Sequence, residues 1–268
     1  LDELDLPEPD VSLGVGSGTH TWQTAQVMLR FEEELRAIDP QMVVVVGDVN
    51  STLACSLVAA KERVPVAHVE AGLRSGDMAM PEEINRLCTD VLCDYLFTTD
   101  HFADENLAAE GVAPSKVFFV GNVMIDTLVK HKALASRLDL MARWGLEPRG
   151  FATLTLHRPS NVDDPAIFRE ILEALAEIAR EVPIVFPIHP RTRKMVGEFG
   201  FGRYFTEGER PRGLWMTEPL GYLDLLHLNM NARMVVTDSG GLQEESSVLG
   251  VPCITLRDNT ERPVTVSL

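Results

Sequence analysis

Acidic residues follow two apolar runs in the first third of the chain. Asp48 comes directly after MVVVV and one glycine, and Glu70 comes directly after VPVAHV. A third acid, Glu82, follows the loop SGDMAMP at the expected start of a helix. Carboxylates at such positions act as general acids or bases in many enzymes. The three acids are therefore candidates for proton transfer.

The segment TDSGGLQEE, residues 237–245, combines a strand end with a helix start. Ser239 is a helix-capping type, and Gly240 and Gly241 allow a ligand to approach the backbone. Free N–H groups and the helix dipole at such a position suit a phosphate or diphosphate. We expect Glu245 to accept hydrogen bonds from a ribose diol, because an acid beside a diphosphate is otherwise unfavourable. A glycine pair can also mark an ordinary turn.

Basic groups that could hold a diphosphate are spread along the chain: Arg74, Arg86, His157, Arg158, His189, Arg191 and Arg262. Each could instead be a solvated surface charge, which is the commoner role of arginine. Two of them are favoured by position: Arg86 in PEEINR lies at an expected helix start, and Arg262 in DNTERP follows an expected buried strand and a turn. Metal binding by the acids is the alternative, and we rank it lower because no DxD-type pair lies near the phosphate segment.

Short apolar runs alternate with helical patterns along the whole chain. The expected strands are DVSLGV, MVVVVGD, VPVAHVE, YLFTTD, KVFFVGN, FATLTLHR, PIVFPIHP, LWMTEP, ARMVVTDS and VPCITLRD. Such alternation predicts parallel sheets covered by helices on both faces, with ligands at the carboxyl ends of the strands. The alternation of strand and helix patterns is interrupted once, so we place a domain boundary at Gly121 and Asn122. The prediction is an α/β chain of two Rossmann-like domains, residues 1–121 and 122–268, that face a cleft.

Composition excludes several classes of protein. The chain has 268 residues, a formal net charge of −16 and a pI near 4.8, which disfavours binding to nucleic acid or to an anionic membrane. Its four cysteines lack paired CxxC spacing, so we expect reduced thiols and a cytoplasmic location rather than disulfides or zinc. No stretch approaches the roughly 20 apolar residues of a membrane span.

Seven ordered motifs resemble those of the non-hydrolysing UDP-N-acetylglucosamine 2-epimerases. They are GDVNST, HVEAGLRSGD, PEEINR, GNVMIDTL, HRPSN, TDSGGLQEE and DNTERP, and the similarity runs from about residue 40 to the end. The resemblance implies a glycosyltransferase-B-like pair of Rossmann domains. It also implies reversible conversion of UDP-N-acetylglucosamine to UDP-N-acetylmannosamine, by elimination of UDP to 2-acetamidoglucal and re-addition after exchange of the C2 proton. No cofactor, NAD or metal is implied, and the family forms homodimers.

The resemblance also assigns roles to residues of this chain. The family's catalytic set falls on Asp48, Glu70, Glu82 and His157, with the division between acid and base left open. Its UDP-contacting positions fall on Arg86, His189, Ser239, Gly240, Gly241, Glu245 and Arg262. His157 is placed near the diphosphate, where a cationic imidazole would help UDP to leave.

The family has further elements that this chain does not match. They are a first strand with a basic phosphate-contacting motif, and a closing segment beyond TERPVTV. We therefore expect a middle portion of the family's length, without the first strand of the first domain and the end of the second. Three alternatives stay open: a hydrolysing 2-epimerase, a glycosyltransferase of the same fold, and, less favoured because all three acids are present, a non-catalytic nucleotide-sugar-binding module.

Overall fold

The chain forms two compact units, each built on its own parallel sheet. This computed structural model describes residues 4, 6–206, 208–257 and 259–266. The N-terminal unit contains residues 7–123 and 259–266, and the C-terminal unit contains residues 124–257 with Leu4 and Leu6. The predicted pair of Rossmann-like parallel-sheet domains is confirmed. The units divide close to Gly121 and Asn122, but residues 259–266 pack with the N-terminal unit instead of the second domain in which we expected them.

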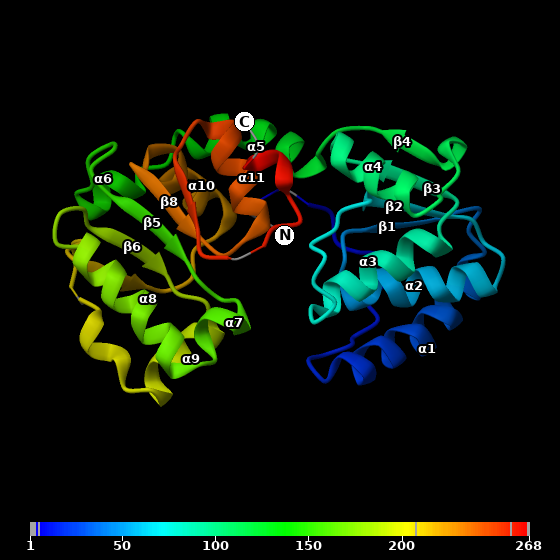
Figure 1. The fold of residues 1–268 in the computed structure, drawn as a ribbon, viewed down its shortest axis with the longest axis horizontal. Helices are drawn as coiled ribbons and strands as arrows, with labels where there is room; N and C mark the ends of the chain where they lie inside the picture. The colour runs from blue at the N-terminus through cyan, green and yellow to red at the C-terminus, as the bar shows by residue number, and fades with distance from the viewer. Residues whose placement is uncertain (1–3, 5, 207, 258, 267–268) are drawn as a thin grey trace. The chain divides into compact units, whose positions relative to one another are not determined.

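The N-terminal unit has a four-stranded parallel sheet of order β1-β2-β3-β4 (Figure 1). Its elements are α1 (His20–Ile38), β1 (Val43–Val46), α2 (Asn50–Lys61), β2 (Val66–Ala71), α3 (Pro81–Leu92), β3 (Tyr95–Thr98), α4 (His101–Ala109), the 3-10 turn η2 (Pro114–Lys116), β4 (Val117–Phe119) and, near the end of the chain, η4 (Pro263–Thr265). α3 begins at Pro81, because proline has no N–H and the first turn of a helix does not need one. Glu82 and Glu83 in the same turn complement the helix dipole.

One expected strand is absent from this unit. Residues 10–15, DVSLGV, are described and form no strand. Gly14 has φ of +58°, and the Leu13 carbonyl accepts a hydrogen bond from the Arg30 side chain on α1 at 2.6 Å. A left-handed backbone interrupts the extended conformation that a strand needs. The prediction of a strand here was therefore wrong.

The C-terminal unit has a five-stranded parallel sheet of order β7-β6-β5-β8-β9. Its elements are α5 (Val123–Ala135), α6 (Leu140–Trp144), β5 (Ala152–Thr155), α7 (Pro159–Val162), α8 (Pro165–Ile178), β6 (Ile184–Pro187), α9 (Pro190–Glu198), η3 (Phe201–Tyr204), β7 (Leu214–Thr217), α10 (Tyr222–Asn231), β8 (Met234–Thr237), α11 (Gly240–Leu249) and β9 (Cys253–Thr255). The chain adds strands on one side of β5 and then on the other. β5 and β8 therefore form a topological switch point, where open α/β sheets bind ligands.

Helices cover both faces of the C-terminal sheet, as predicted. Leu154 and Phe186 pack with Phe168 of α8 on one face. Val185 and Val235 belong to a second buried cluster, with α6 and α10 on the other face (Figure 1). Alternate residues of the same strands thus enter two different cores, as the pleat of a strand requires.

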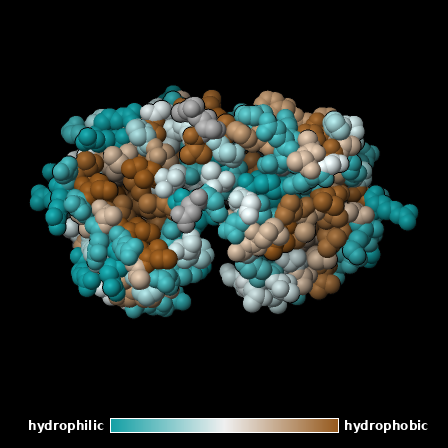
Figure 2. Space-filling model, viewed as in Figure 1, coloured by the Kyte–Doolittle hydropathy of each residue, from teal (hydrophilic) through white to brown (hydrophobic). Residues whose placement is uncertain are grey.

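The N-terminal sheet differs, because one of its faces is exposed. Parallel pairing puts Val44, Val46, Tyr95 and Phe118 on the same face, and each is at least 39% exposed. α1, α2 and the buried Val43 and Val45 form a core on the opposite face. Apolar side chains are visible at the surface of both units (Figure 2). The expectation that both faces are covered is wrong for this sheet within the described residues. No helix in the described part of the chain is long and apolar enough to cross a membrane.

Candidate active site

The switch point of the C-terminal sheet is organised around a buried carboxylate. Asp238 follows β8, and its Oδ2 accepts hydrogen bonds from the backbone N–H groups of His157 at 2.8 Å and Arg158 at 2.7 Å, after β5. Its Oδ1 lies 2.9 Å from Nδ1 of the His157 ring. Burial alone would raise the pKa of Asp238, but the His157 side chain and the two N–H donors hold it below its ordinary value. The sequence placed Asp238 at a strand end without assigning it this role.

Asp238 orients one of the two histidines predicted for the site. Nδ1 of His157 faces Asp238, which leaves Nε2 as the ring's other polar atom on a side chain that is 42% exposed. The His189 ring lies 5.6 Å from the His157 ring between centroids. Burial, the nearby His157 and Arg191 lower the pKa of His189. Two imidazole rings therefore lie together at the ends of β5 and β6.

The start of α11 has the features expected of an anion site. Ser239 occupies the N-cap position, and its backbone N–H donates to the Thr237 hydroxyl at 2.9 Å. Within the described residues its own hydroxyl makes no capping hydrogen bond. Gly240 and Gly241 form the first turn of the helix. A serine hydroxyl and the first N–H groups of a ten-residue helix can together hold a phosphate.

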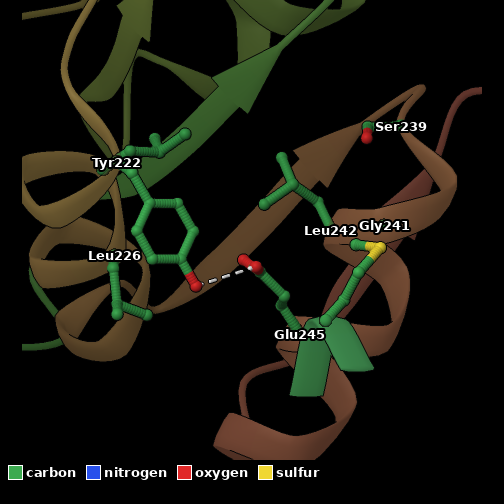
Figure 3. A pocket seen from close by; sticks show the side chains of 8 residues that line it. Tyr222, Leu226, Ser239, Gly241, Leu242 and Glu245 are labelled. Carbon is green, nitrogen blue, oxygen red and sulfur yellow. Dashed lines mark hydrogen bonds between the residues drawn. The ribbon is translucent and has the colours of Figure 1, made fainter. Parts of the chain in front are cut away.

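A pocket of about 180 Å³ lies beside this helix start (Figure 3). Its lining residues are Met124, Tyr222, Leu225, Leu226, Ser239, Gly241, Leu242 and Glu245. Complete small-molecule sites have volumes of about 300–1,000 Å³. The pocket is therefore the size of a subsite, and its apolar walls suit the flat surface of a ribose or base.

Glu245 is the polar group of this pocket. It is buried, and its Oε1 accepts a hydrogen bond from the Tyr222 hydroxyl at 3.2 Å (Figure 3). Burial and repulsion by Glu244 raise the pKa of Glu245, against the effect of the Tyr222 hydroxyl. Burial and Glu245 also raise the pKa of Tyr222. Tyr222, the first residue of α10, was not predicted as a site residue.

Buried arginines hold two of the predicted carboxylates in the N-terminal unit. Asp48 after β1 forms an ion pair with Arg86 at 2.5 Å, and Arg262 forms one with Glu70 after β2 at 3.1 Å. Both guanidinium groups are at most 7% exposed. The structure thus brings Asp48 together with Arg86, and Glu70 with Arg262. Those two arginines were predicted to contact UDP.

α3 contains two adjacent acids, Glu82 and Glu83, and only Glu82 was predicted as a site residue. Glu83 accepts hydrogen bonds from the backbone N–H groups of Ser75 and Gly76 and pairs with Arg86 at 2.6 Å. Burial opposes these interactions, but together they lower the pKa of Glu83. Glu82 is half-buried on the same helix, and no hydrogen bond or ion pair is found for it among the described residues. Glu83 therefore anchors the loop of residues 71–80, and Glu82 stays available for chemistry.

That the proposed site residues of the two units form a single site stays a prediction. Asp48, Glu70 and Glu82 belong to the N-terminal unit, and His157, Ser239 and Glu245 belong to the C-terminal unit. Among the described residues, no three His, Cys, Asp or Glu side chains are grouped as metal ligands.

Comparison with known proteins agrees with these features. The family described as UDP-N-acetylglucosamine 2-epimerase matches residues 1–268. The UDP-N-acetylglucosamine 2-epimerase of Methanocaldococcus jannaschii is 44% identical, over 100% of this chain and 74% of that protein. Its crystal structure in complex with UDP-GlcNAc and UDP superposes with a TM-score of 0.91, over 99% of this chain and 73% of that one.

Two bacterial relatives extend the comparison. The UDP-N-acetylglucosamine 2-epimerase of Escherichia coli is 36% identical, over 97% of this chain and 70% of that protein. The UDP-2,3-diacetamido-2,3-dideoxy-D-glucuronate 2-epimerase of Pseudomonas aeruginosa is 40% identical, over 97% of this chain and 71% of that protein. Both the whole-length family match and the relatives' identity and coverage lead to one conclusion: this chain is an enzyme of the UDP-N-acetylglucosamine 2-epimerase family.

Proposed function

We propose that the chain interconverts UDP-N-acetylglucosamine and UDP-N-acetylmannosamine. The observation that carries this proposal is the arrangement at the β5–β8 switch point, where an Asp238-oriented histidine and a helix start suited to diphosphate lie in one unit. The relative from Methanocaldococcus jannaschii, which has been crystallised with UDP-GlcNAc and UDP, supports the same ligand class.

The C-terminal unit would bind the UDP portion. Ser239, Gly240 and Gly241 offer a hydroxyl and helix N–H groups to the diphosphate. Glu245 would accept hydrogen bonds from the ribose hydroxyls in the adjacent pocket. Burial and the nearby Glu244 raise the pKa of Glu245, and two hydroxyl groups would stabilise its ionised form.

The reaction would start with removal of the C2 proton by one of the three carboxylates, Asp48, Glu70 or Glu82. The electrons of the C2–H bond form a C1=C2 double bond, and the C1–O bond breaks with its electron pair on the departing UDP. The products of this step are 2-acetamidoglucal and UDP. Return of a proton to the opposite face of C2, with re-formation of the C1–O bond, gives the epimer.

The histidine pair would assist the departing group. His157 is held by Asp238 through Nδ1, so a proton on Nε2 is directed away from that carboxylate. An imidazolium there would stabilise negative charge that develops on the diphosphate. His189, whose Nδ1 accepts a hydrogen bond from the Arg191 backbone N–H, supplies a second hydrogen-bonding ring beside it.

Turnover in heavy water tests this proposal against its alternatives. NMR should show a UDP-linked product with deuterium at C2 of both epimers. Free N-acetylmannosamine with UDP would indicate the hydrolysing reaction, and a lengthened acceptor would indicate a glycosyltransferase. Binding of UDP-N-acetylglucosamine without any conversion would indicate a non-catalytic module.

A second substrate is favoured by one of the relatives. The Pseudomonas aeruginosa protein is named for a diacetamido-glucuronate and is nearly as similar as the first relative, at 40% against 44% identity. Both substrates would undergo the same inversion at C2 and differ in the groups at C3 and C6. The ratio of kcat/KM for the two UDP-sugars decides between them.

The assembly and location are also part of the proposal. We infer that the protein is a homodimer, as the family resemblance implies. We also infer a cytoplasmic location, because its four cysteines lack paired CxxC spacing. Light scattering coupled to gel filtration measures the assembly, and a monomeric mass at micromolar concentration would contradict it.

A further inference from the structure

A buried polar cluster lies behind the ends of β1 and β2, beneath the two predicted strand-end carboxylates. His68 on β2 is fully buried, and its Nδ1 lies 2.6 Å from Oδ1 of Asp90 on α3. Its Nε2 lies 2.8 Å from the carbonyl oxygen of Gly47. Oδ2 of Asp90 accepts a hydrogen bond from the backbone N–H of Gly72 at 3.0 Å. One carboxylate therefore connects both loops.

The hydrogen-bond partners of His68 fix the orientation of its ring. A carbonyl oxygen only accepts, so Nε2 donates to Gly47. Nδ1, on the other side of the ring, contacts the Asp90 carboxylate at 2.6 Å. Asp90 also contacts the Arg74 guanidinium at 2.7 Å. Glu110 balances that arginine with two hydrogen bonds, at 2.8 and 2.7 Å.

In each of the two loops that Asp90 connects, a residue at or next to a predicted carboxylate has a left-handed backbone conformation. Gly47, with φ of +69°, precedes Asp48. Glu70 itself has φ of +72°, a region that residues with a Cβ avoid, and the β2–β3 register shifts between Val69 and Ala71. Such a conformation persists only where the surrounding structure enforces it.

Contacts of the Gly72 backbone enforce the left-handed conformation of Glu70 from two neighbouring helices. Asp90 takes the Gly72 N–H, and Asn106 on α4 donates to the Gly72 carbonyl oxygen at 2.9 Å. Gly72 has φ of +80°, and a Cβ there would lie 2.5 Å from the backbone oxygen of Ala103. The chain just after Glu70 is therefore fixed between α3 and α4.

We propose that Asp90, through His68 and the Gly72 N–H, is a positioning residue that sets the directions of the Asp48 and Glu70 carboxylates. This inference rests on the proposed function, because those two acids are its predicted proton-transfer groups. Asp90 lies too deep to touch substrate, being 1% exposed in its side chain. Its removal should misplace the acids without affecting the UDP-binding residues of the C-terminal unit.

The closing experiment compares Asp90→Asn with a matched control. Asp94→Asn removes a carboxylate that accepts from the Val66 N–H at 3.1 Å, at the opposite end of the same strand. Asp90→Asn should lower kcat on the order of 10²-fold, since a displacement of about 1 Å in a catalytic group has that effect. The dissociation constant for UDP and the KM should not change, and Asp94→Asn should keep the wild-type kcat.

A second variant keeps the test decisive if Asp90→Asn does not fold. In His68→Gln, the amide nitrogen can still donate to Gly47, but no second ring nitrogen remains to contact Asp90. It should show the same loss of kcat with unchanged UDP affinity. The low-field NMR signal of the proton between His68 and Asp90 should disappear in both variants.

The outcomes separate the two proposals. A wild-type protein that converts neither UDP-sugar refutes the proposed function, and amide hydrogen exchange at Gly72 then still tests the link. Faster exchange at Gly72 in Asp90→Asn than in Asp94→Asn supports the link, and equal exchange overturns it. An active wild type whose kcat is unchanged by Asp90→Asn refutes the positioning role.

Discussion

The two units hold their predicted site carboxylates in opposite ways. In the N-terminal unit, Asp48 and Glu70 each contact a buried arginine. In the C-terminal unit, Glu245 contacts the neutral hydroxyl of Tyr222, and burial with repulsion by Glu244 raises its pKa. A carboxylate with a built-in cation is fixed before ligand arrives. Glu245 instead has a neutral donor as its partner and lies in a buried position.

The two sheets differ as well. Both faces of the C-terminal sheet contribute to buried clusters, whereas the N-terminal sheet exposes Val44 and Val46 on one face. Apolar side chains on the strands therefore contribute differently to the free energy of unfolding in the two units. The same kind of apolar substitution should be costly in one sheet and nearly neutral in the other.

The largest effect should come from the core of the C-terminal sheet. Leu154→Ala should lower the free energy of unfolding by about 2–5 kcal/mol, because a fully buried leucine is replaced and a cavity remains. Val44→Ala, on the exposed face, should change it by only about 0.5 kcal/mol. Urea titration followed by circular dichroism measures both. Equal losses would show that the face of Val44 is buried in solution.

Catalysis should depend on the N-terminal carboxylates. Glu70→Gln, Asp48→Asn and Glu82→Gln should each lower kcat on the order of 10²-fold or more if the residue acts as general acid or base. UDP affinity, measured by calorimetry, should stay close to that of the wild type. Glu32→Gln is a suitable control, because it removes an exposed ion pair with Arg36. A carboxylate whose amide variant keeps full kcat has no role in proton transfer.

Nucleotide binding should depend on Glu245. Glu245→Ala should weaken the binding of both UDP and the UDP-sugar about 10-fold, which corresponds to the loss of roughly 1.4 kcal/mol of hydrogen bonding. Tyr222→Phe should have a smaller effect, since it removes only the group that orients Glu245. Unchanged UDP affinity in Glu245→Ala would exclude the ribose role.

The smallest effect should be on the pH dependence of stability, with opposite signs for two acids of the C-terminal unit. The raised pKa of Glu245 means that the folded state holds its proton more tightly, so its contribution is full below about pH 4.5 and is lost as pH rises through the folded pKa. The lowered pKa of Asp238 means that this residue stabilises the folded state when pH is above its ordinary pKa. This stabilisation is lost as pH falls through the folded pKa.

Thermal unfolding across pH distinguishes these signs. Relative to wild type, Glu245→Gln should gain stability as pH rises above about 4.5, because it removes a group that becomes unfavourable when ionised. Asp238→Asn should lose stability relative to wild type as pH rises to about 3.8 from below, because it removes favourable interactions of the ionised carboxylate, and the difference should stay constant at higher pH. Parallel curves for the two variants would contradict the assigned pKa directions.

The sequence by itself determined most of the elements and the ends of most strands. Val/Ile/Leu runs alternating with helical patterns specify parallel strands, and the residues that follow them must lie at the carboxyl edge of a sheet. Asp48, Glu70 and His157 could be placed there without coordinates, and so could the Ser239–Gly241 helix start. These signals act over a few residues, so they survive in any packing of the elements.

Only the tertiary structure decided which of these side chains contact each other. Glu82 and Glu83 are neighbours of the same type, and the packing of α3 against the loop at Ser75 turns only Glu83 inward. Arg262 meets Glu70 across 192 residues because residues 259–266 pack with the N-terminal unit. Such contacts depend on how whole elements pack, and no local pattern encodes the partner of a side chain so distant in sequence.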